Sequence, residues 1–321
     1  MKYLLTLNAG SSSLKYALYT TGLELVKKGE TSLDDLPSLF TESVSAIGHR
    51  IVHGGKKYTK STKIDAKLIQ ELSKLRELAP LHNGLAVQVI EKCVAHYGDT
   101  LFQLAVFDTT FFRNMPDLSR YYAISKKYEI ERFGFHGIAH ESLWNAYVEK
   151  TGKKEAKIIT LQLGSGSSIA AIENGNPIDT SMGYTPNEGL VMATRSGDID
   201  PQVVVELAKT MPLADAMDIL NRESGLLGLS GTTSRMQELI EENPNQFAIE
   251  LYCYRCIKYI GAYIAALKGV DAIIFSGGIG ENSPLIRQKI LDALSWHTFE
   301  VFVIPSDENR FIARELRGQL G

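Results

Sequence analysis

The chain carries an internal repeat, and no other feature constrains its fold as strongly. Residues 4–19, LLTLNAGSSSLKYALY, align with residues 158–173, IITLQLGSGSSIAAIE. The identical pairs in register are Thr6/Thr160, Leu7/Leu161, Gly10/Gly164, Ser11/Ser165, Ser13/Ser167 and Ala17/Ala171. Each copy has the pattern of an apolar strand, a Gly/Ser turn and a second strand. The repeat therefore predicts a duplicated chain, unless two common strand–turn–strand patterns look alike by chance.

Strand and helix patterns alternate in the rest of the chain. Helical spacing of apolar residues predicts a helix over 63–79, and the short run LFQLAVFD predicts a buried strand over 101–108. After the second copy, the predicted elements are helices over about 201–210, 214–222 and 246–268, and a strand over 272–278. This order predicts two α/β halves with Gly-rich turns after their strands. Open α/β sheets bind ligands at such strand ends.

The length and net charge of the chain indicate what kind of partner it binds. From its length of 321 residues alone, we expect the chain to form two domains. Its formal net charge of −3 gives no electrostatic reason to expect a nucleic acid or a membrane surface as partner. The N-terminal run enters a strand without a basic and apolar leader, and no uncharged apolar stretch approaches about 18 residues. We therefore expect a cytoplasmic protein that acts on a small molecule.

The cysteines do not suggest a metal site. Cys253 and Cys256 form a C-x-x-C pair, but this pair lies in a run with helical periodicity, and no second pair is nearby. We expect these residues to be reduced thiols in a helix.

Three glycine-rich turns are candidates for binding phosphate. They are NAGSSS at 8–13, GSGSS at 164–168 and SGGIGEN at 276–282. Small residues let backbone N–H groups and hydroxyls come close to phosphate oxygens, and the third turn is expected to open a helix. Each turn alone is a weak signal because Gly/Ser turns are common. Three of them at the strand ends of one duplicated chain form a stronger signal.

Two arginines lie in glycine-flanked segments. Arg50 is at the centre of GHRIVHGG, and Arg195 lies in TRSGDIDP. The planar guanidinium group suits carboxylate and phosphate groups, so these two residues could hold both substrates of a transfer reaction. The alternative for each is a structural salt bridge.

An acid and a histidine complete the set of candidates. Asp108 ends a predicted strand, and His136 lies between Phe135 and Gly137. A histidine beside an aromatic residue is more often part of a core. Its spacing to His140 resembles a metal pair, but the acid of an HExxH motif is missing.

Eight segments, taken together and in order, resemble the acetate kinase (acetokinase) family. They are NAGSSSLK at 8–15, GHRIVHGG at 48–55, LAPLHN at 78–83, FDTTF at 107–111, FGFHGIAHESL at 133–143, SMGYTPNEGLVMATRSGDIDP at 181–201, ESGLLGLSG at 223–231 and SGGIGEN at 276–282. The resemblance implies the fold of the acetate and sugar kinase, Hsp70 and actin superfamily, with two duplicated, ribonuclease H-like α/β domains. It implies an N-terminal domain of residues 1–111 with 311–321, and a C-terminal domain of residues 112–310 on the nucleotide and dimer side.

The resemblance also implies roles for single residues. Arg50 and Arg195 would bind the carboxylate and the transferring phosphoryl group. His136 would contact this phosphoryl group, and Asp108 would orient the acceptor. The implied acyl pocket consists of Val52, Leu81, Phe135 and Pro186, and the implied magnesium site consists of Asn8 and Glu308. The implied nucleotide site consists of Ser11, Ser13, Lys15, Gln162, Leu163, Gly164, Ser165, Gly166, Arg235, Met236, Gln237, Gly278, Ile279, Gly280, Glu281 and Asn282.

The chain departs from the family's pattern in length and on the nucleoside side. It is shorter between the first hairpin and GHRIVHGG, and again between SGGIGENS and VFVIPS. Gln162 stands where the family commonly has His, Ser165 where it has Asn, and residues 235–237 are Arg-Met-Gln where it has Asp-Phe-Arg. The acyl and phosphoryl side is intact, so these changes put the donor in question.

The implied reaction is reversible, Mg²⁺-dependent transfer of a phosphoryl group between ATP and acetate, giving acetyl phosphate and ADP, by a homodimer. The residue types agree with this chemistry, because phosphoryl transfer needs mainly positioning and charge neutralisation. A carboxylate acceptor is already ionised at pH 7, so no strong base is required. Three alternatives stay open: a propionate kinase, a pyrophosphate-dependent acetate kinase, and a nucleotide-binding regulator on the same fold.

Overall fold

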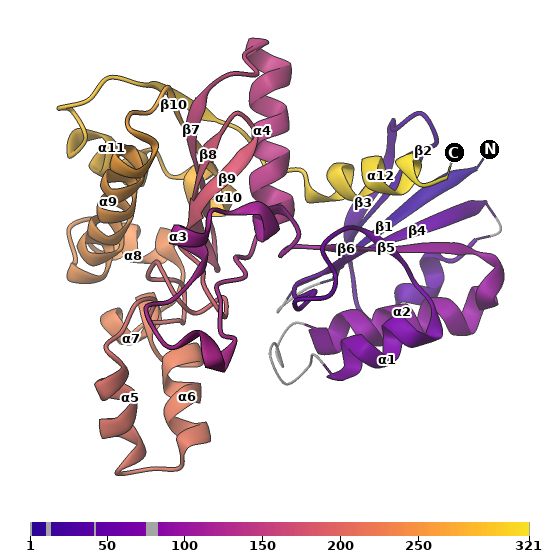
Figure 1. Cartoon of the computed structure of the whole chain (residues 1–321), viewed down its shortest axis with the longest axis horizontal. Coiled ribbons are helices and arrows are strands. Elements are labelled where there is room, and N and C mark those ends of the chain that lie inside the picture. The colour runs from indigo at the N-terminus through magenta and orange to yellow at the C-terminus, as the bar shows by residue number, and fades with distance from the viewer. Residues whose placement is uncertain (1, 11–13, 42, 75–82, 321) are drawn as a thin grey trace. The chain divides into compact units, whose positions relative to one another are not determined.

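The computed structural model describes residues 2–10, 14–41, 43–74 and 83–320 (Figure 1). The chain forms two compact units. Unit 1 comprises residues 1–113, 135–142 and 307–321, and unit 2 comprises residues 114–134 and 143–306. Helix α4 (Gly137–Thr151) begins in unit 1 and ends in unit 2. The domain boundaries implied by the family resemblance stay a prediction.

Unit 1 is built on a sheet of mixed direction with the strand order β3-β2-β1-β4-β6-β5. Its strands are β1 (Tyr3–Ala9), β2 (Leu14–Thr20), β3 (Leu25–Thr31), β4 (Val44–Ile51), β5 (Thr62–Lys63) and β6 (Phe102–Phe107). β1, β4 and β6 are parallel, whereas β2 pairs antiparallel with both β1 and β3. The first copy of the repeat therefore forms the predicted strand–turn–strand, and the predicted strand over 101–108 is confirmed as β6.

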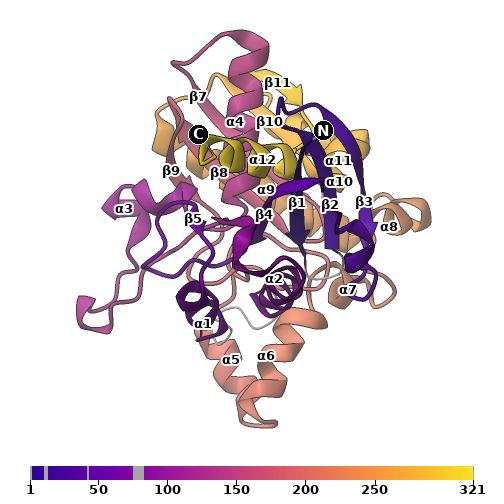
Figure 2. The same cartoon turned by 90° about the vertical axis from the view of Figure 1, so that its right-hand side faces the viewer.

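Both faces of the sheet in unit 1 are covered by helices. These are α1 (Ala66–Lys74), α2 (Asn83–Tyr97) and α12 (Glu308–Gly318). Successive strand residues point to opposite faces, so Leu5 packs on the side of α1 and α2 while Leu4 packs on the side of α12 (Figures 1 and 2). α12 lies so close to β4 that a Cβ atom on Gly48 would be 2.4 Å from Ile312 Cγ2. The helix predicted over 63–79 is found as α1, and residues 75–79 lie outside the described residues.

Unit 2 is built on a second sheet, with the strand order β11-β10-β7-β8-β9. Its strands are β7 (Lys157–Leu163), β8 (Ser167–Glu173), β9 (Asn176–Thr180), β10 (Ala272–Ser276) and β11 (Glu300–Val303). Its further helices are α3 (Asp117–Arg120), α5 (Pro201–Ala208), α6 (Leu213–Arg222), α7 (Gly225–Ser230), α8 (Met236–Glu242), α9 (Phe247–Leu267), α10 (Gly277–Asn282) and α11 (Pro284–Asp292). The predicted helices are thus confirmed as α5, α6 and α9, and the predicted strand over 272–278 is confirmed as β10, with α10 opening directly after it.

The long helix α9 forms the core of unit 2 together with β7, β8 and β10. Cys253 and Cys256 are buried on this helix as free thiols, as expected from its periodicity. Burial raises the pKa of Cys253 to about 12, so this thiol stays protonated. Among the helices of the described residues, none combines the length and apolarity needed to cross a bilayer.

The two sheets share one strand arrangement. β1, β2 and β3 correspond to β7, β8 and β9, while β4 and β10 take the parallel position beside the first strand of each unit. The register agrees as well. Asn8 lies opposite Arg50 in unit 1, and Gln162, which matches Asn8 in the repeat, lies opposite Ser276 in unit 2. The duplication predicted from the repeat is therefore confirmed in the fold.

Candidate active site

The strand ends of unit 1 gather a cluster of charged and polar side chains. Asn8 lies near the end of β1, Arg50 near the end of β4, and Asp108 directly after β6. Because these strands are parallel neighbours, their carboxyl ends meet at one edge of the sheet. Glu308 joins them as the first residue of α12, far away in the sequence. All four residues belong to unit 1.

Arg50 is the centre of this cluster. Its Nη2 donates to Asp108 Oδ2 at 2.7 Å and its Nε donates to Asp108 Oδ1 at 3.2 Å, a two-pronged pair. Its Nη1 donates to Asn8 Oδ1 at 3.0 Å and lies 3.6 Å from Glu308 Oε2. Asn8 Nδ2 in turn donates to Glu308 Oε2 at 2.5 Å. The side chain of Asp108 is fully buried and that of Arg50 is 11% exposed, so the contacts are shielded from water.

The protonation equilibria follow from burial and from these pairs. Burial alone would lower the pKa of Arg50, but the charges of Asp108 and Glu308 outweigh it and hold this pKa above its ordinary value. Burial raises the pKa of Asp108, and the Arg50 charge opposes this rise. Burial would also raise the pKa of Glu308, but Arg50 and the Asn8 hydrogen bond hold it below the ordinary value. The single Arg50 guanidinium thus acts on both carboxylates, opposing the rise in the pKa of Asp108 and lowering the pKa of Glu308.

His136 lies at the edge of the same cluster, directly before α4. Its φ of 57° is in the left-handed region, which histidine enters more readily than most residues but which still carries strain. Its backbone N–H bonds to Asp108, and its charge helps to lower the pKa of Glu308. The next residue must be small, because a Cβ atom on Gly137 would lie 2.0 Å from the Asp108 carbonyl oxygen. The hydrogen bond to Asp108 and the close packing at Gly137 therefore hold the histidine beside the acids despite its strained backbone.

The predicted acyl pocket is described only in part. Val52 and Phe135 are buried in unit 1, and the Phe135 ring packs edge-on against His53 at 5.3 Å. Pro186 is buried in unit 2, and Leu81 lies outside the described residues. That these residues form one pocket stays a prediction.

Arg195 lies in unit 2, in the loop that follows β9. Its Nη1 donates to the Pro186 carbonyl oxygen at 3.1 Å. Burial lowers the pKa of Arg195, in contrast to Arg50, whose pKa is raised by two carboxylates. Arg50 and Arg195 belong to different units, so their joint action on one substrate stays a prediction.

One cavity of unit 2 collects many of the residues predicted to bind nucleotide. Its volume is about 580 Å³, within the range of ligand-binding pockets. It is lined by Arg235, Met236, Gln237, Gly278, Ile279 and Asn282, together with Ile240, Glu241, Ser283, Pro284 and Leu285. Sequence reasoning missed the last five. The one-turn spacing of Met236 and Ile240 on α8 is the signal that could have found Ile240.

The backbones at the ends of β7 and β10 lie very close to each other. Gln162 has a buried Oε1 without a hydrogen-bond partner in the described part of the chain. Gly277 follows β10 at a φ of 78°, and a Cβ atom there would lie 2.4 Å from the Leu163 carbonyl oxygen. Its N–H donates to Glu281 Oε1 at 2.9 Å, so Glu281 caps its own helix.

The other residues predicted for the phosphate turns are placed as follows. Gly164 N–H donates to the Gly166 carbonyl at 3.1 Å, and Ser165 is exposed between them. Gly280 is buried in α10. Lys15 is exposed on β2, and its charge contributes to lowering the pKa of Glu308. Ser11 and Ser13 lie outside the described residues.

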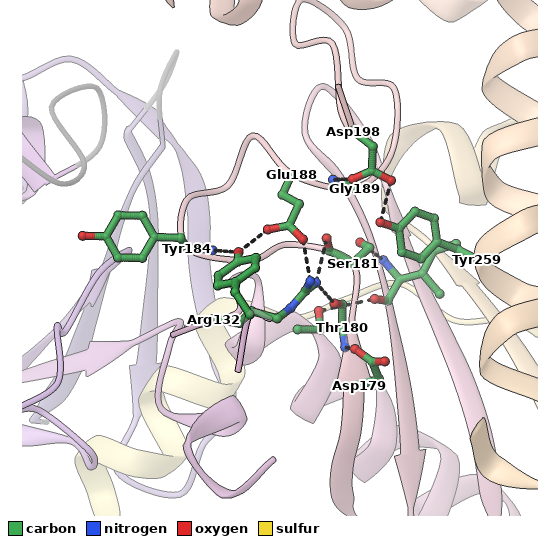
Figure 3. Close-up of polar contacts among 11 residues, drawn as sticks. Arg132, Asp179, Thr180, Ser181, Tyr184, Glu188, Gly189, Asp198 and Tyr259 are labelled. Carbon is green, nitrogen blue, oxygen red and sulfur yellow. Dashed lines mark hydrogen bonds and ion pairs between the residues drawn. The ribbon is translucent and has the colours of Figure 1, made fainter. Parts of the chain in front are cut away.

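Unit 2 contains a second polar network, which was not predicted from the sequence. Figure 3 shows Arg132 paired with Glu188, which precedes Arg195 in the loop after β9. Glu188 lies in the recognised segment at 181–201, and Arg132 directly precedes the recognised segment at 133–143. Their pairing was not visible because 56 positions separate them. In the part of the chain that the structure describes, no three His, Cys, Asp or Glu side chains gather as a metal site.

The fold and these strand-end sites define the class of the protein. Two α/β units with matching sheets are the duplicated fold of the acetate and sugar kinase, Hsp70 and actin superfamily. Residues 31–314 match the model of the acetokinase family. The chain belongs to the acetokinase family.

Individual relatives agree with this assignment. The chain is 45% identical to the acetate kinase of Chloroherpeton thalassium over 282 residues, which are 84% of this chain and 66% of the relative. It is 46% identical to the acetate kinase of Brachyspira hyodysenteriae over 261 residues, 78% of this chain and 66% of the relative. The matches thus span slightly less than two thirds of these relatives' lengths.

Two solved structures resemble the whole chain. The acetate kinase of Porphyromonas gingivalis has a TM-score of 0.87 at 31% identity, with 100% of both chains covered. The propionate kinase of Francisella tularensis has a TM-score of 0.91 at 31% identity, with 99% of this chain and 100% of that chain covered.

Proposed function

We propose that this protein is a carboxylate kinase that transfers a phosphoryl group between ATP and acetate, giving acetyl phosphate and ADP. The observation that carries the proposal is the Arg50–Asp108 pair with Asn8 and Glu308 at the strand ends of unit 1. Membership of the acetokinase family supports the same reaction. The similarity to a propionate kinase keeps propionate as an alternative acceptor.

In the proposed reaction, an acetate oxygen attacks the γ-phosphorus of ATP, and the bond from this phosphorus to the bridging oxygen of ADP breaks. Arg50 and Arg195 bind the acetate carboxylate and the equatorial phosphoryl oxygens, whose charge they neutralise. His136 donates to a phosphoryl oxygen. Asp108 holds the Arg50 guanidinium through two hydrogen bonds and thereby orients the acceptor. Acetate is ionised at neutral pH, so no residue has to take a proton from it.

The residues around Glu308 fit a magnesium ion. Mg²⁺ in phosphoryl-transfer sites takes oxygen ligands, usually one or two carboxylates completed by phosphate and water. Glu308 and the amide oxygen of Asn8 supply such ligands, and Glu308 is held ionised by its surroundings. When bound, the ion would neutralise charge on the β- and γ-phosphate oxygens. Asn8 and Glu308 are the residues proposed to hold it.

The cavity of about 580 Å³ in unit 2 supports a nucleoside as part of the donor. It is lined by residues of the turns 235–237 and 278–282, and apolar Met236 and Ile279 offer a surface for a base. Gln162, with its buried Oε1, is proposed to face the phosphates at the end of β7. We therefore favour ATP over pyrophosphate as donor.

We also propose that the protein is a cytoplasmic homodimer. Exposed apolar side chains on α5 and α6, among them Val205, Leu213 and Met217, support a further interface on unit 2. Figures 1 and 2 show these two helices side by side as a hairpin. Size-exclusion chromatography with light scattering tests the dimer.

A coupled assay with acetate, ATP and Mg²⁺ tests the proposed function, with hydroxylamine trapping of acetyl phosphate as readout. We expect ADP and acetyl phosphate in equal amounts. Turnover with propionate well above that with acetate would favour a propionate kinase, and turnover with pyrophosphate alone would replace the donor. Nucleotide binding without any turnover would favour a regulator on the same fold.

A further inference from the structure

The loop 181–198 of unit 2 is anchored by a partly buried ion pair. Arg132 Nη1 donates to Glu188 Oε1 at 2.5 Å, and the Tyr122 hydroxyl donates to Glu188 Oε2 (Figure 3). The side chains of Arg132 and Glu188 are 16% and 28% exposed. Arg132 Nη2 also donates to the Thr180 carbonyl at 2.7 Å, which fixes the pair to the end of β9. Glu188 is therefore held by partners outside its own loop.

Tyr122 extends this anchor to the start of the loop. Its hydroxyl accepts a hydrogen bond from Tyr184 N–H at 2.8 Å. Burial and the adjacent Glu188 raise the pKa of Tyr122, so its hydroxyl stays protonated and can donate to Glu188. Glu188 packs directly against the backbone of Gly183, because a Cβ atom on Gly183 would lie 1.7 Å from Glu188 Oε2. Through Tyr122, the Glu188 carboxylate thus connects the two ends of the segment 183–188.

The side chain of Arg195 rests on this segment. Its Nη1 donates to the carbonyl of Pro186, two residues before Glu188. The backbone beyond Arg195 is fixed separately, because Asp198 Oδ1 accepts from Gly189 N–H at 2.8 Å and Asp198 Oδ2 accepts from the Tyr259 hydroxyl at 2.8 Å (Figure 3). The network therefore has one branch for the Arg195 guanidinium and another for its backbone.

We propose that Glu188 is a positioning residue, which holds the Pro186 carbonyl and through it the Arg195 guanidinium in the orientation that phosphoryl transfer requires. The proposal rests on the proposed function, in which Arg195 binds the phosphoryl group or the carboxylate. A displacement of about 1 Å in a catalytic group can cost roughly 100-fold in rate. Loss of the carboxylate charge would release the segment while leaving the nucleotide cavity intact.

The test compares Glu188→Gln with the matched control Glu131→Gln. Glu131 is next to Arg132 in sequence, has a side chain that is 10% exposed, and lies 3.7 Å from the guanidinium of Arg120. We expect Glu188→Gln to lower kcat about 100-fold with the KM for ATP nearly unchanged, and Glu131→Gln to change neither. In an Arg195→Ala background, Glu188→Gln should cause no further loss of the residual kcat. Equal losses in both backgrounds would overturn the proposal.

A second measurement does not depend on activity. Phenylglyoxal modifies accessible arginines, and peptide mass spectrometry gives the rate at Arg195. Glu188→Gln should raise this rate severalfold relative to wild type and to Glu131→Gln, and an unchanged rate would overturn the positioning role. If wild type forms no acetyl phosphate, the proposed function fails while this rate still decides the role of Glu188. Tyr122→Phe, which removes one hydroxyl, replaces Glu188→Gln in both measurements if the glutamine variant does not fold.

Discussion

The two sheets of this protein place different chemistry at the same structural position. In unit 1, Asn8 and Arg50 lie opposite each other at the ends of two parallel strands, and in unit 2 the equivalent pair is Gln162 and Ser276. The first pair is tied to Asp108 and Glu308 as a set of ions. The second pair is uncharged. The two units therefore share the same strand pairing. They differ in the side chains at the strand ends, which are partly ionic in unit 1 and uncharged in unit 2.

The energetic consequences of the two strand ends also differ. Buried ions are costly to separate, because removing one partner leaves the other charged and without compensation. A hydroxyl such as that of Ser276, which accepts from Ser306 N–H at 2.9 Å, contributes about 1 kcal/mol. Unit 1 should therefore be far more sensitive than unit 2 to a single substitution at this register position.

The largest expected effect is that of Arg50→Ala. Arginines that stabilise a transferring phosphoryl group are worth about 10³-fold or more in turnover. The variant also leaves the buried Asp108 without its ion partner, which should lower the free energy of unfolding by about 3–5 kcal/mol. Initial rates with acetate and urea unfolding curves measure the two effects.

Ser276→Ala is the matched control for Arg50→Ala, because it changes the equivalent position of unit 2. It should lower turnover less than about tenfold and stability by about 1 kcal/mol. If the two variants lose similar activity, the division of labour between the strand ends is wrong.

The strand pattern was predictable and the candidate residues could be singled out, but the contacts among these residues could not be predicted. The repeat predicted two strand–turn–strand copies, and both are present as β1–β2 and β7–β8. Arg50 and Asp108 were singled out separately. Their two-pronged pair depends on β4 lying beside β6, and local periodicity does not reveal strand neighbours.

Long-range partners explain the remaining gaps. Glu308 joins Asn8 across 300 positions because α12 packs on the face of the first sheet, which no short window of sequence contains. Glu188 was missed for the same reason, since its partners Tyr122 and Arg132 precede it by more than 50 positions. Family resemblance supplied Glu308 as a candidate, and nothing comparable pointed to Glu188.

Each unit also holds a partly buried acid outside the strand-end sites, and the surroundings of the two acids differ. In unit 1, burial and the neighbouring Glu315 raise the pKa of Glu141 from 4.5 to about 7. In unit 2, burial raises the pKa of Asp179 to about 6, and the charge of Arg132 opposes this rise. The pKa of Glu141 is higher in the folded state than in the unfolded state. The folded state is therefore destabilised progressively as the pH rises from about 4.5 to about 7.

Glu141→Gln should therefore stabilise the protein at high pH only. At pH 8 the free energy of unfolding should rise by up to about 3 kcal/mol, because one pKa unit corresponds to about 1.4 kcal/mol. At pH 4.5 the variant and wild type should be nearly equal. Urea unfolding at the two pH values is the measurement, and a gain that is the same at both would show that the effect is one of packing.

A substitution at Val52, a unit 1 residue of the predicted acyl pocket, should have a smaller effect. Val52→Ala removes two methyl groups from a residue that is buried directly after β4. If Val52 contacts the methyl group of acetate, the space favours a longer acyl chain, and one methylene is worth about 1–3 kcal/mol in such a pocket. The ratio of kcat/KM for propionate to that for acetate should rise at least tenfold. An unchanged ratio would remove Val52 from the pocket.

The smallest effect concerns discrimination between nucleotides in unit 2. In the cavity of about 580 Å³, Gln237 Nε2 donates to Glu241 Oε1 at 2.9 Å, and Arg235 pairs with Glu238 at 2.8 Å. The polar side chains of Arg235 and Gln237 thus already have partners, Glu238 and Glu241, on the same exposed helix, so they are poorly placed to read the edge of a base. The apolar side chains of Met236 and Ile279 can contact any purine ring.

We therefore expect kcat/KM for ATP to exceed that for GTP by less than about tenfold, or 1.4 kcal/mol. A site built to hydrogen-bond one base rejects its analogue far more strongly, because its own polar groups are then left without partners. Measurement of kcat/KM for ATP, GTP and CTP at saturating acetate and Mg²⁺ tests this expectation. A hundredfold preference for ATP would mean that other groups of the cavity read the base, with Glu241 and Asn282 as the first to replace by alanine. Unit 2 would then hold a specific site as sharply defined as the ionic cluster of unit 1.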